Sequence, residues 1–252
     1  RYNFNGISNL GSLIRVLTTE SADKIKVTLI EGWTIDKIAD KINEKLDINI
    51  DIFKSLCQNY NFIHSLGIKS LSLEGFLFPD TYVFLKSYTE EDIITVLVNN
   101  FFKKYKKAVS VSNKSKYTME ELITLASIIQ GEYMIPHTDE LSLISSVYHN
   151  RLDKKMYLQA DPTIQYILPG DNRRLYNKHL KIESPYNTYK YKGLPPGPIN
   201  NPGYDAILAA INPKKSDLLY FVADGEGRHI FTKTNKDHNR AKNKLKKNKK
   251  RF

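Results

Sequence analysis

The sequence predicts an α+β protein: a small α/β unit, then a larger mixed α/β domain built around one strong helix, with a β-hairpin near the C-terminus. Three local patterns lead to this prediction. An apolar run at residues 27–30 precedes apolar residues at helical spacing, a helix-capping sequence begins at residue 118, and a turn sequence at 224–227 separates two apolar runs. With 252 residues, 41% of them hydrophobic, the chain is long enough for one large domain or two modest ones.

The first unit is expected over residues 24–72. Residues 27–30 form a strand candidate, residues 31–33 a turn, and Thr34 is a residue type that caps helix N-termini. The apolar residues that follow recur at helical spacing: Ile35, Ile38, Ala39 and Ile42. A second helix is suggested by Phe53, Leu56, Cys57 and Tyr60. Cys57 is the single cysteine, which excludes a disulfide framework, and we expect it in the core.

A junction and a connecting helix are expected over residues 73–116. The stretch 73–82 is apolar and rich in turn residues, and residues 90–108 have the spacing of an amphipathic helix that ends in a basic cluster. Residues 109–116 are polar and resemble a linker. Glu74 is a rival acid within the apolar stretch, and we interpret it as a structural carboxylate at the junction.

The main domain is expected over residues 117–241. Residues 118–121 match a capping box, in which a Thr hydroxyl and a Glu carboxylate three residues later bond each other's backbone N–H groups. An apolar stripe follows: Leu122, Leu125, Ala126 and Ile129. A further helix is predicted from about residue 140 to 152, and strands at 220–222 and 229–232 flank the hairpin turn.

Asp161 has two interpretations. Asp161 followed by Pro162 is typical of an N-cap with proline at the first helical position, opening a helix through Ile164 and Tyr166. The capping role is the interpretation that we favour from the pattern. The same loop is also a candidate for the lining of a cleft, with Asp161 as a second carboxylate there.

Positive charge is concentrated at the C-terminal end. The net charge is +11, and the basic tail over residues 242–252 holds six Lys and one Arg with no acidic residue. Such a tail is more often a frayed, solvated end than a binding site for nucleic acid, anionic lipid or cell wall. No helix-turn-helix, zinc-finger or RNA-binding signature is present, so nucleic acid is not an expected partner. No apolar run is long enough to span a membrane.

Glu132 is the leading candidate for acid–base chemistry. It lies seven residues after Leu125 and four after Ile128, at the edge of the apolar stripe. A carboxylate there loses solvation, which raises its pKa and allows it to donate a proton near neutral pH. The alternative is a helix-end glutamate that turns to water, which Gly131 would make easier.

Other chemistries lack their motifs. The six histidines show no pairing at helical spacing and no H-E-x-x-H sequence, so no metal is expected. No G-x-S-x-G elbow or P-loop occurs, which argues against acyl transfer and nucleotide use, and no cofactor is expected.

An ordered series of motifs runs along the chain: LEGFLFPDTY at 73–82, LASIIQGE at 125–132, NRL at 150–152, LQADPT at 158–163, YNTY at 186–189, GLPPGPI at 193–199, NPG at 201–203 and YFVADG at 220–225. Over residues 24–240 this series resembles the MltG (YceG-like) endolytic murein transglycosylase family. The resemblance implies that residues 24–72 are a LysM-like glycan-binding module and that residues 117–241 are the catalytic domain around a catalytic helix.

The family's catalytic glutamate maps onto Glu132. Many relatives have a second Glu where this chain has Gln130. The other register would place Gln130 at the catalytic position and make the chain inactive. The expected substrate-binding residues are Gln159, Asp161, Thr163, Tyr186, Asn187, Thr188 and Tyr189.

The resemblance implies cleavage of the MurNAc–GlcNAc bond within peptidoglycan strands, with one Glu as acid and then base and a 1,6-anhydro end as product. It also implies a single-pass membrane helix before Arg1, a catalytic part on the extracytoplasmic (periplasmic) side, and cell-wall synthases as candidate partners. Two alternatives remain: an inactive peptidoglycan-binding envelope protein of the same fold, or a muramidase-type hydrolase.

Overall fold

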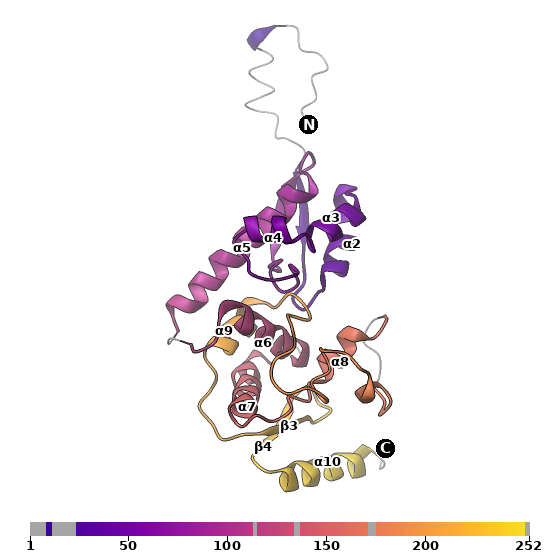
Figure 1. Cartoon of the computed structure of the whole chain (residues 1–252), viewed down its shortest axis with the longest axis vertical. Coiled ribbons are helices and arrows are strands. Elements are labelled where there is room, and N and C mark those ends of the chain that lie inside the picture. The colour runs from indigo at the N-terminus through magenta and orange to yellow at the C-terminus, as the bar shows by residue number, and fades with distance from the viewer. Residues whose placement is uncertain (1–8, 12–23, 113–114, 134–136, 171–174, 250–252) are drawn as a thin grey trace.

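The computed structural model describes residues 9–11, 24–112, 115–133, 137–170 and 175–249. Helices and two small sheets form an elongated molecule in which an N-terminal half lies above a C-terminal half (Figure 1). The α+β class expected from the sequence is confirmed, because the described strands form two separate two-stranded antiparallel sheets among helices. One continuous hydrophobic core runs through both halves.

The N-terminal half is built on a sheet whose second strand comes from the junction. Strand β1 (Lys24–Thr28) pairs antiparallel with β2 (Thr81–Leu85), so that Thr28 lies opposite Thr81. The strand expected at residues 27–30 therefore begins and ends earlier in the chain. The reason is that its extent is set by the length of a partner more than 50 residues away, which the local sequence pattern does not contain.

The helices of this half follow β1. Thr34 is at the N-cap position of α2 as predicted, although its side chain forms no capping hydrogen bond. The single second helix predicted around Phe53 is wrong, because Asn59 accepts a hydrogen bond from the Phe62 N–H and starts a new helix after a break at Cys57. Cys57 is fully buried, as expected. The helices are α2 (Ile35–Leu46), α3 (Ile50–Leu56) and α4 (Tyr60–Ser65).

Helix α5 (Glu90–Ser110) connects the two halves. It begins with a capping box between Thr89 and Asp92, and it crosses the molecule diagonally in Figure 1. Its buried face contacts α3 in the N-terminal half and α9 in the C-terminal half. The amphipathic helix expected at residues 90–108 is therefore confirmed, and it links the two parts of the core.

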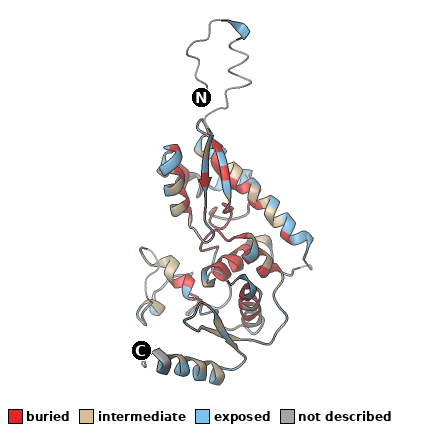
Figure 2. Cartoon of the chain, turned by 180° about the vertical axis from the view of Figure 1, so that it is seen from behind, coloured by how far each residue is buried: buried red, intermediate tan, exposed pale blue. Residues whose placement is uncertain are grey.

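Helix α6 (Met119–Glu132) is the centre of the C-terminal half. The predicted capping box is present, since the Glu121 N–H donates to the Thr118 hydroxyl and the Thr118 N–H donates to the Glu121 carboxylate. The four residues predicted to form the apolar stripe are buried, and so is every other residue from 122 to 130, because neighbours surround the helix (Figure 2). Its neighbours are α7 (Leu141–Asp153), α8 (Asp161–Ile167) and α9 (Tyr204–Ile211).

The chain ends with a hairpin and a basic helix. Strands β3 (Tyr220–Ala223) and β4 (His229–Thr232) pair across the predicted turn, and α10 (Asn235–Lys249) packs against both strands. The frayed end expected for the basic tail is wrong up to Lys249, because these residues continue α10. Ala241 and Leu245 are half-buried, whereas the lysines at 242, 244, 246 and 247 are exposed. Two short 3-10 segments, Thr138–Glu140 and His179–Lys181, complete the described elements.

None of the helices in the described ranges combines the length and the apolar composition that crossing a bilayer requires. The membrane helix that the family resemblance implies before Arg1 stays a prediction.

Gly75 provides a test of how tightly the junction packs on the C-terminal half. Its φ is +89°, and a Cβ there would lie 2.5 Å from Pro198 and 2.9 Å from the Ile123 side chain. Gly75→Ala is therefore expected to lower the free energy of unfolding by about 3 kcal/mol, from overpacking added to backbone strain. Gly193 has the same φ with no atom within 4 Å of such a Cβ, so Gly193→Ala is expected to cost only about 1 kcal/mol. Urea denaturation measures both, and equal losses would contradict the packing.

Candidate active site

Two carboxylates meet where the C-terminal end of α6 approaches the N-terminal end of α8. The contact is between Gly131 and Pro162: a Cβ on Gly131 would lie 2.6 Å from the Pro162 Cβ. Glu132 follows that glycine and Asp161 precedes that proline. Only a residue without a side chain allows the two helices to approach so closely, and this approach brings the two acids to one place.

Glu132 is half-buried and has a raised pKa. Burial is the largest cause, since it removes solvation from the ionised form, and it raises the pKa of Glu132 to about 7. The Tyr148 hydroxyl donates a 2.7 Å hydrogen bond to Glu132 Oε1, which lowers the pKa, while the negative charge of Asp161 raises it. Glu132 is therefore not a carboxylate turned freely to water. Near neutral pH it can both donate and accept a proton.

Tyr148 and Arg151 on α7 form the inner wall beside Glu132. Tyr148 is 1% exposed and packs edge-to-face against Phe221 of β3. The Arg151 guanidinium donates to the carbonyls of Leu158 at 2.6 Å and Leu219 at 2.7 Å. Arg151 thus ties the loop before α8 to the start of the hairpin. Sequence reasoning missed Tyr148, because no local pattern marks it and its partner Glu132 lies 16 residues earlier in the chain.

Asp161 is an exposed partner of this cluster rather than a helix cap. The N-cap of α8 is Ala160, and Asp161 and Pro162 are the first residues of the helix, so the predicted capping role is wrong. The Tyr189 hydroxyl donates a hydrogen bond to Asp161 instead. Burial and this bond both raise the pKa of Tyr189. The capping prediction failed because the partner of Asp161 is a tyrosine on a distant loop, which the local sequence pattern does not contain.

The other residues expected to bind substrate differ in accessibility. Gln159 is exposed, has a left-handed backbone with φ of 49°, and donates its N–H to the Thr188 carbonyl. Tyr186 is half-buried and packs beside Tyr166. Three side chains are buried and bonded within the protein, namely Thr163, Asn187 and Thr188. Their contact with substrate stays a prediction, and in the free protein they fix the loop that carries Gln159 and Tyr189.

Gln130 faces away from the Glu132 cluster. It is 8% exposed, and its Oε1 accepts a 3.0 Å hydrogen bond from the Gly203 N–H. Its side chain also packs against Gly32. Gln130 thus joins α6 to the turn after β1 and to the loop before α9, where the Glu31 carboxylate lies against Gly203.

A groove of about 840 Å³ opens beside this site, between the N-terminal half and α8. Glu132 does not line it, but Gly131 and Pro162 do, so the groove reaches the contact next to the two carboxylates. Its other walls mix polar groups with one aromatic ring, and they include Thr34, Asp36, Glu74, Gln165, Tyr166 and Asn200.

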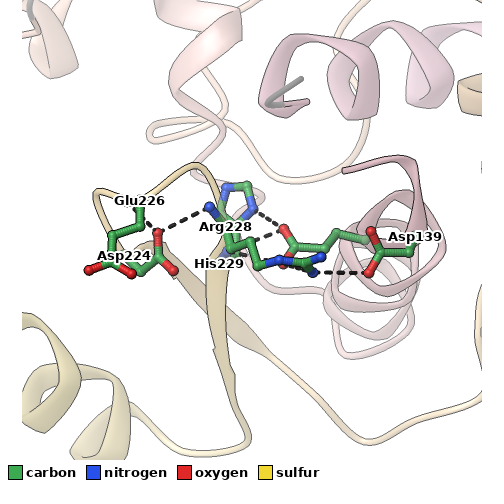
Figure 3. A network of polar contacts seen from close by, with 6 residues as sticks. Asp139, Asp224, Glu226, Arg228 and His229 are labelled. Atoms are coloured by element: carbon green, nitrogen blue, oxygen red, sulfur yellow. Dashed lines mark hydrogen bonds and ion pairs between the residues drawn. The ribbon is translucent and has the colours of Figure 1, made fainter. Parts of the chain in front are cut away.

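A second polar network holds the hairpin against the segment that leads into α7 (Figure 3). The buried Glu140 accepts hydrogen bonds from the His229 backbone N–H at 3.2 Å and from the His229 ring at 2.9 Å. Arg228 donates to Asp139 at 3.0 Å. The network lies at the tip of β4, and it anchors the hairpin that Tyr148 and Arg151 also contact.

A raised-pKa acid at the end of a buried helix, beside a second carboxylate and a groove, makes this region the candidate for acid–base chemistry. The YceG-like family model matches residues 1–244. The chain belongs to the YceG-like family.

Individual relatives are similar over most of the chain. An endolytic murein transglycosylase of Bacillus subtilis is 37% identical over 96% of this chain and 71% of its own length. One from Streptococcus pneumoniae is 35% identical over 85% of this chain, which spans 43% of that relative. A crystal structure of a YceG-like protein from Listeria monocytogenes superposes with a TM-score of 0.76 at 33% identity, covering 91% of this chain and 80% of that one.

Tyr148→Phe tests the contact that controls Glu132. The phenol hydroxyl favours the ionised carboxylate, so its removal is expected to raise the pKa of Glu132 above about 7. A carboxyl-carbon NMR titration, assigned by comparison with Glu132→Gln, measures the shift. Tyr166→Phe is the control, because Tyr166 packs on Tyr186 and not on Glu132. An unchanged or lowered pKa in Tyr148→Phe would contradict the assignment.

Glu132 is also expected to reduce stability at alkaline pH. Its pKa is higher in the folded state than the ordinary value of 4.5, so its contribution to stability is present below pH 4.5 and is lost as the pH rises to about 7. Glu132→Gln should remove this loss. Between pH 5 and pH 8, the wild type is expected to lose up to about 3 kcal/mol more of its free energy of unfolding than the variant does. Urea denaturation at both pH values measures the difference, with the exposed Glu91→Gln as control.

Proposed function

We propose that this protein is an endolytic peptidoglycan lytic transglycosylase that cleaves the MurNAc–GlcNAc bond within glycan strands, with Glu132 as its catalytic acid and base. The observation that carries the proposal is the environment of Glu132: a desolvated carboxyl with pKa raised to about 7, hydrogen-bonded by Tyr148 and close to Asp161. The curated relatives from Bacillus and Streptococcus carry the name of this activity, which supports the choice of substrate.

The first step uses the protonated form of Glu132. The carboxylic acid donates its proton to the glycosidic oxygen as the bond from that oxygen to C1 of MurNAc breaks. The GlcNAc residue leaves with a free 4-hydroxyl, and positive charge develops at C1 and the ring oxygen. A pKa near 7 supports this step, because a large fraction of the acid is then protonated at neutral pH.

The second step uses the carboxylate that remains. It accepts the proton of the MurNAc C6 hydroxyl while that oxygen bonds to C1, which closes the 1,6-anhydro ring and regenerates the acid. No water is consumed. A hydrolase needs a second carboxylate as nucleophile or to activate water, and an internal nucleophile removes that need.

Asp161 and the loops around it are proposed to hold the sugar. Asp161 is exposed beside Glu132, and its negative charge is suited to the positive charge that develops at C1. Gln159 and Tyr189 have accessible polar or aromatic surface near it, and Tyr186 packs beside Tyr166, which lines the groove; such groups suit the hydroxyls and the C–H face of a pyranose. Thr163, Asn187 and Thr188 are proposed to act by fixing this loop.

The groove between α2 and α8 is the proposed path of the strand away from the cleaved bond. α2 contributes one wall of the groove, so this path would give a role in strand binding to the N-terminal unit, which the family resemblance implies is LysM-like. Action on the extracytoplasmic side of the membrane, an anchor before Arg1 and contact with cell-wall synthases belong to the same proposal and rest on the family resemblance.

Glycan strands freed of stem peptides, digested with the purified protein and examined by mass spectrometry, test the reaction. The expected products end in 1,6-anhydro-MurNAc, and Glu132→Gln is expected to lower their rate of formation by at least 10³-fold, because acid and base are lost together. Gln130→Glu is the matched control at the neighbouring position, and it is expected to retain activity.

The other outcomes separate the alternatives. Products with only reducing ends would identify a muramidase-type hydrolase. Sedimentation of the protein with insoluble peptidoglycan and no released product would identify a binding protein. Activity that appears only in Gln130→Glu would show that position 130 carries the catalysis.

A further inference from the structure

The segment at residues 199–203 is bonded along the last turns of α6. The Ile199 N–H donates to the Ser127 hydroxyl at 3.0 Å, and the Asn200 side chain donates to the Ser127 carbonyl at 2.8 Å. The Gly203 N–H donates to Gln130 Oε1 at 3.0 Å. These contacts fix the part of the helix that ends at Glu132.

Asn201, in the middle of that segment, is bonded to the N-terminal half instead. Its side-chain amide donates to the Trp33 carbonyl at 2.9 Å and to Glu74 Oε1 at 2.8 Å, and its Oδ1 accepts from the Leu77 N–H at 2.9 Å. Its backbone exchanges two further 2.9 Å bonds with Trp33 and Gly32. Asn201 is 0% exposed, and all of its polar groups are used.

Glu74 completes this link by capping a helix that is distant in sequence. Thr34 makes no capping bond, and the Ile35 N–H at the start of α2 donates to both Glu74 oxygens, at 3.2 and 3.3 Å. The Glu74 oxygens thus accept a hydrogen bond from an N–H group that has no partner within its own helix. Through Glu74 and Asn201, the start of α2 is therefore connected to the segment that holds the end of α6.

We propose that Glu74 and Asn201 are positioning residues for the reaction at Glu132. Together they fix the position of the end of α6 relative to α2 and to the groove between α2 and α8. This inference rests on the proposed function. It assigns a role in catalysis to a carboxylate that touches neither the reacting bond nor Glu132.

The chemistry of the link explains why a polar pair suits this role. An apolar pair of similar volume would stabilise the core at least as well, because a buried carboxylate is costly. Burial raises the pKa of Glu74 to about 8 despite its three N–H donors from Ile35, Asn201 and Gly75. Hydrogen bonds fix distances and directions that apolar contacts leave adjustable, and a misplacement of about 1 Å can lower a rate by ~10²-fold.

Glu74→Gln is the direct test, since it keeps the shape but places an NH₂ group among N–H donors. We expect kcat for release of 1,6-anhydro ends to fall at least tenfold. Glu74 lines the groove but is only 5% exposed, so binding of glycan strands, measured in a Glu132→Gln background, is expected to change less than threefold. Emission of Trp33, the single tryptophan, is expected to shift because its carbonyl is bonded to Asn201.

Glu121→Gln is the matched control. It makes the same substitution at the other end of α6, where Glu121 closes the capping box. We expect it to lower the melting temperature without changing kcat or Trp33 emission. A purely structural role for Glu74 would make the two variants alike, with melting temperature as the only property that changes.

The outcomes distinguish this inference from the proposed function. A wild-type protein that releases no product would overturn the proposed function. An active wild type with Glu74→Gln within twofold of its kcat would overturn this inference alone. If Glu74→Gln does not fold, Ser127→Ala loosens the same connection from the α6 side and is expected to lower kcat in the same direction; unchanged kcat there would equally overturn it.

Discussion

The burial of α6 on all sides is the constraint on which the structure depends. A helix surrounded by α7, α8 and α9 needs hydrogen-bond partners inside the protein for every polar group that it buries. Ser127 and Gln130 find theirs in residues 199–203, and Glu132 finds its partner in Tyr148. The same burial that demands these partners removes solvent from Glu132, so the fold and the reactivity of the acid have one cause.

Two glutamates with raised pKa values lie at opposite ends of one connection. Glu132 is the last residue of α6, and Glu74 caps the start of α2. The segment at residues 199–203 is hydrogen-bonded both to α6 and to Glu74. Each carboxylate is less stable when ionised in the folded protein, so neither is placed where stability alone would favour it. Both positions are therefore costly in folding free energy, which is the pattern expected of functional rather than purely structural groups.

Local signals predicted the elements and failed on the partners. The capping box at Thr118 and the hairpin turn depend on residues within a few positions, and both were predicted correctly. The local pattern at Asp161 favours a helix cap, whereas its hydrogen bond in the structure comes from the Tyr189 hydroxyl on another loop. Thr34 was a correct N-cap by position, while the capping oxygens belong to Glu74. Tyr148 had no local signal at all.

The sequence by itself determined the α+β class, the order of most helices and the candidacy of Glu132, because periodicity, capping and ordered motifs are properties of neighbouring residues. The tertiary structure decided which carboxylates meet, which predicted binding residues are buried, and that β1 pairs with a strand from the junction. These depend on contacts between segments separated by up to 168 residues. The close contact between Gly131 and Pro162 and the hydrogen bond between Glu74 and Asn201 form only when the whole chain is packed.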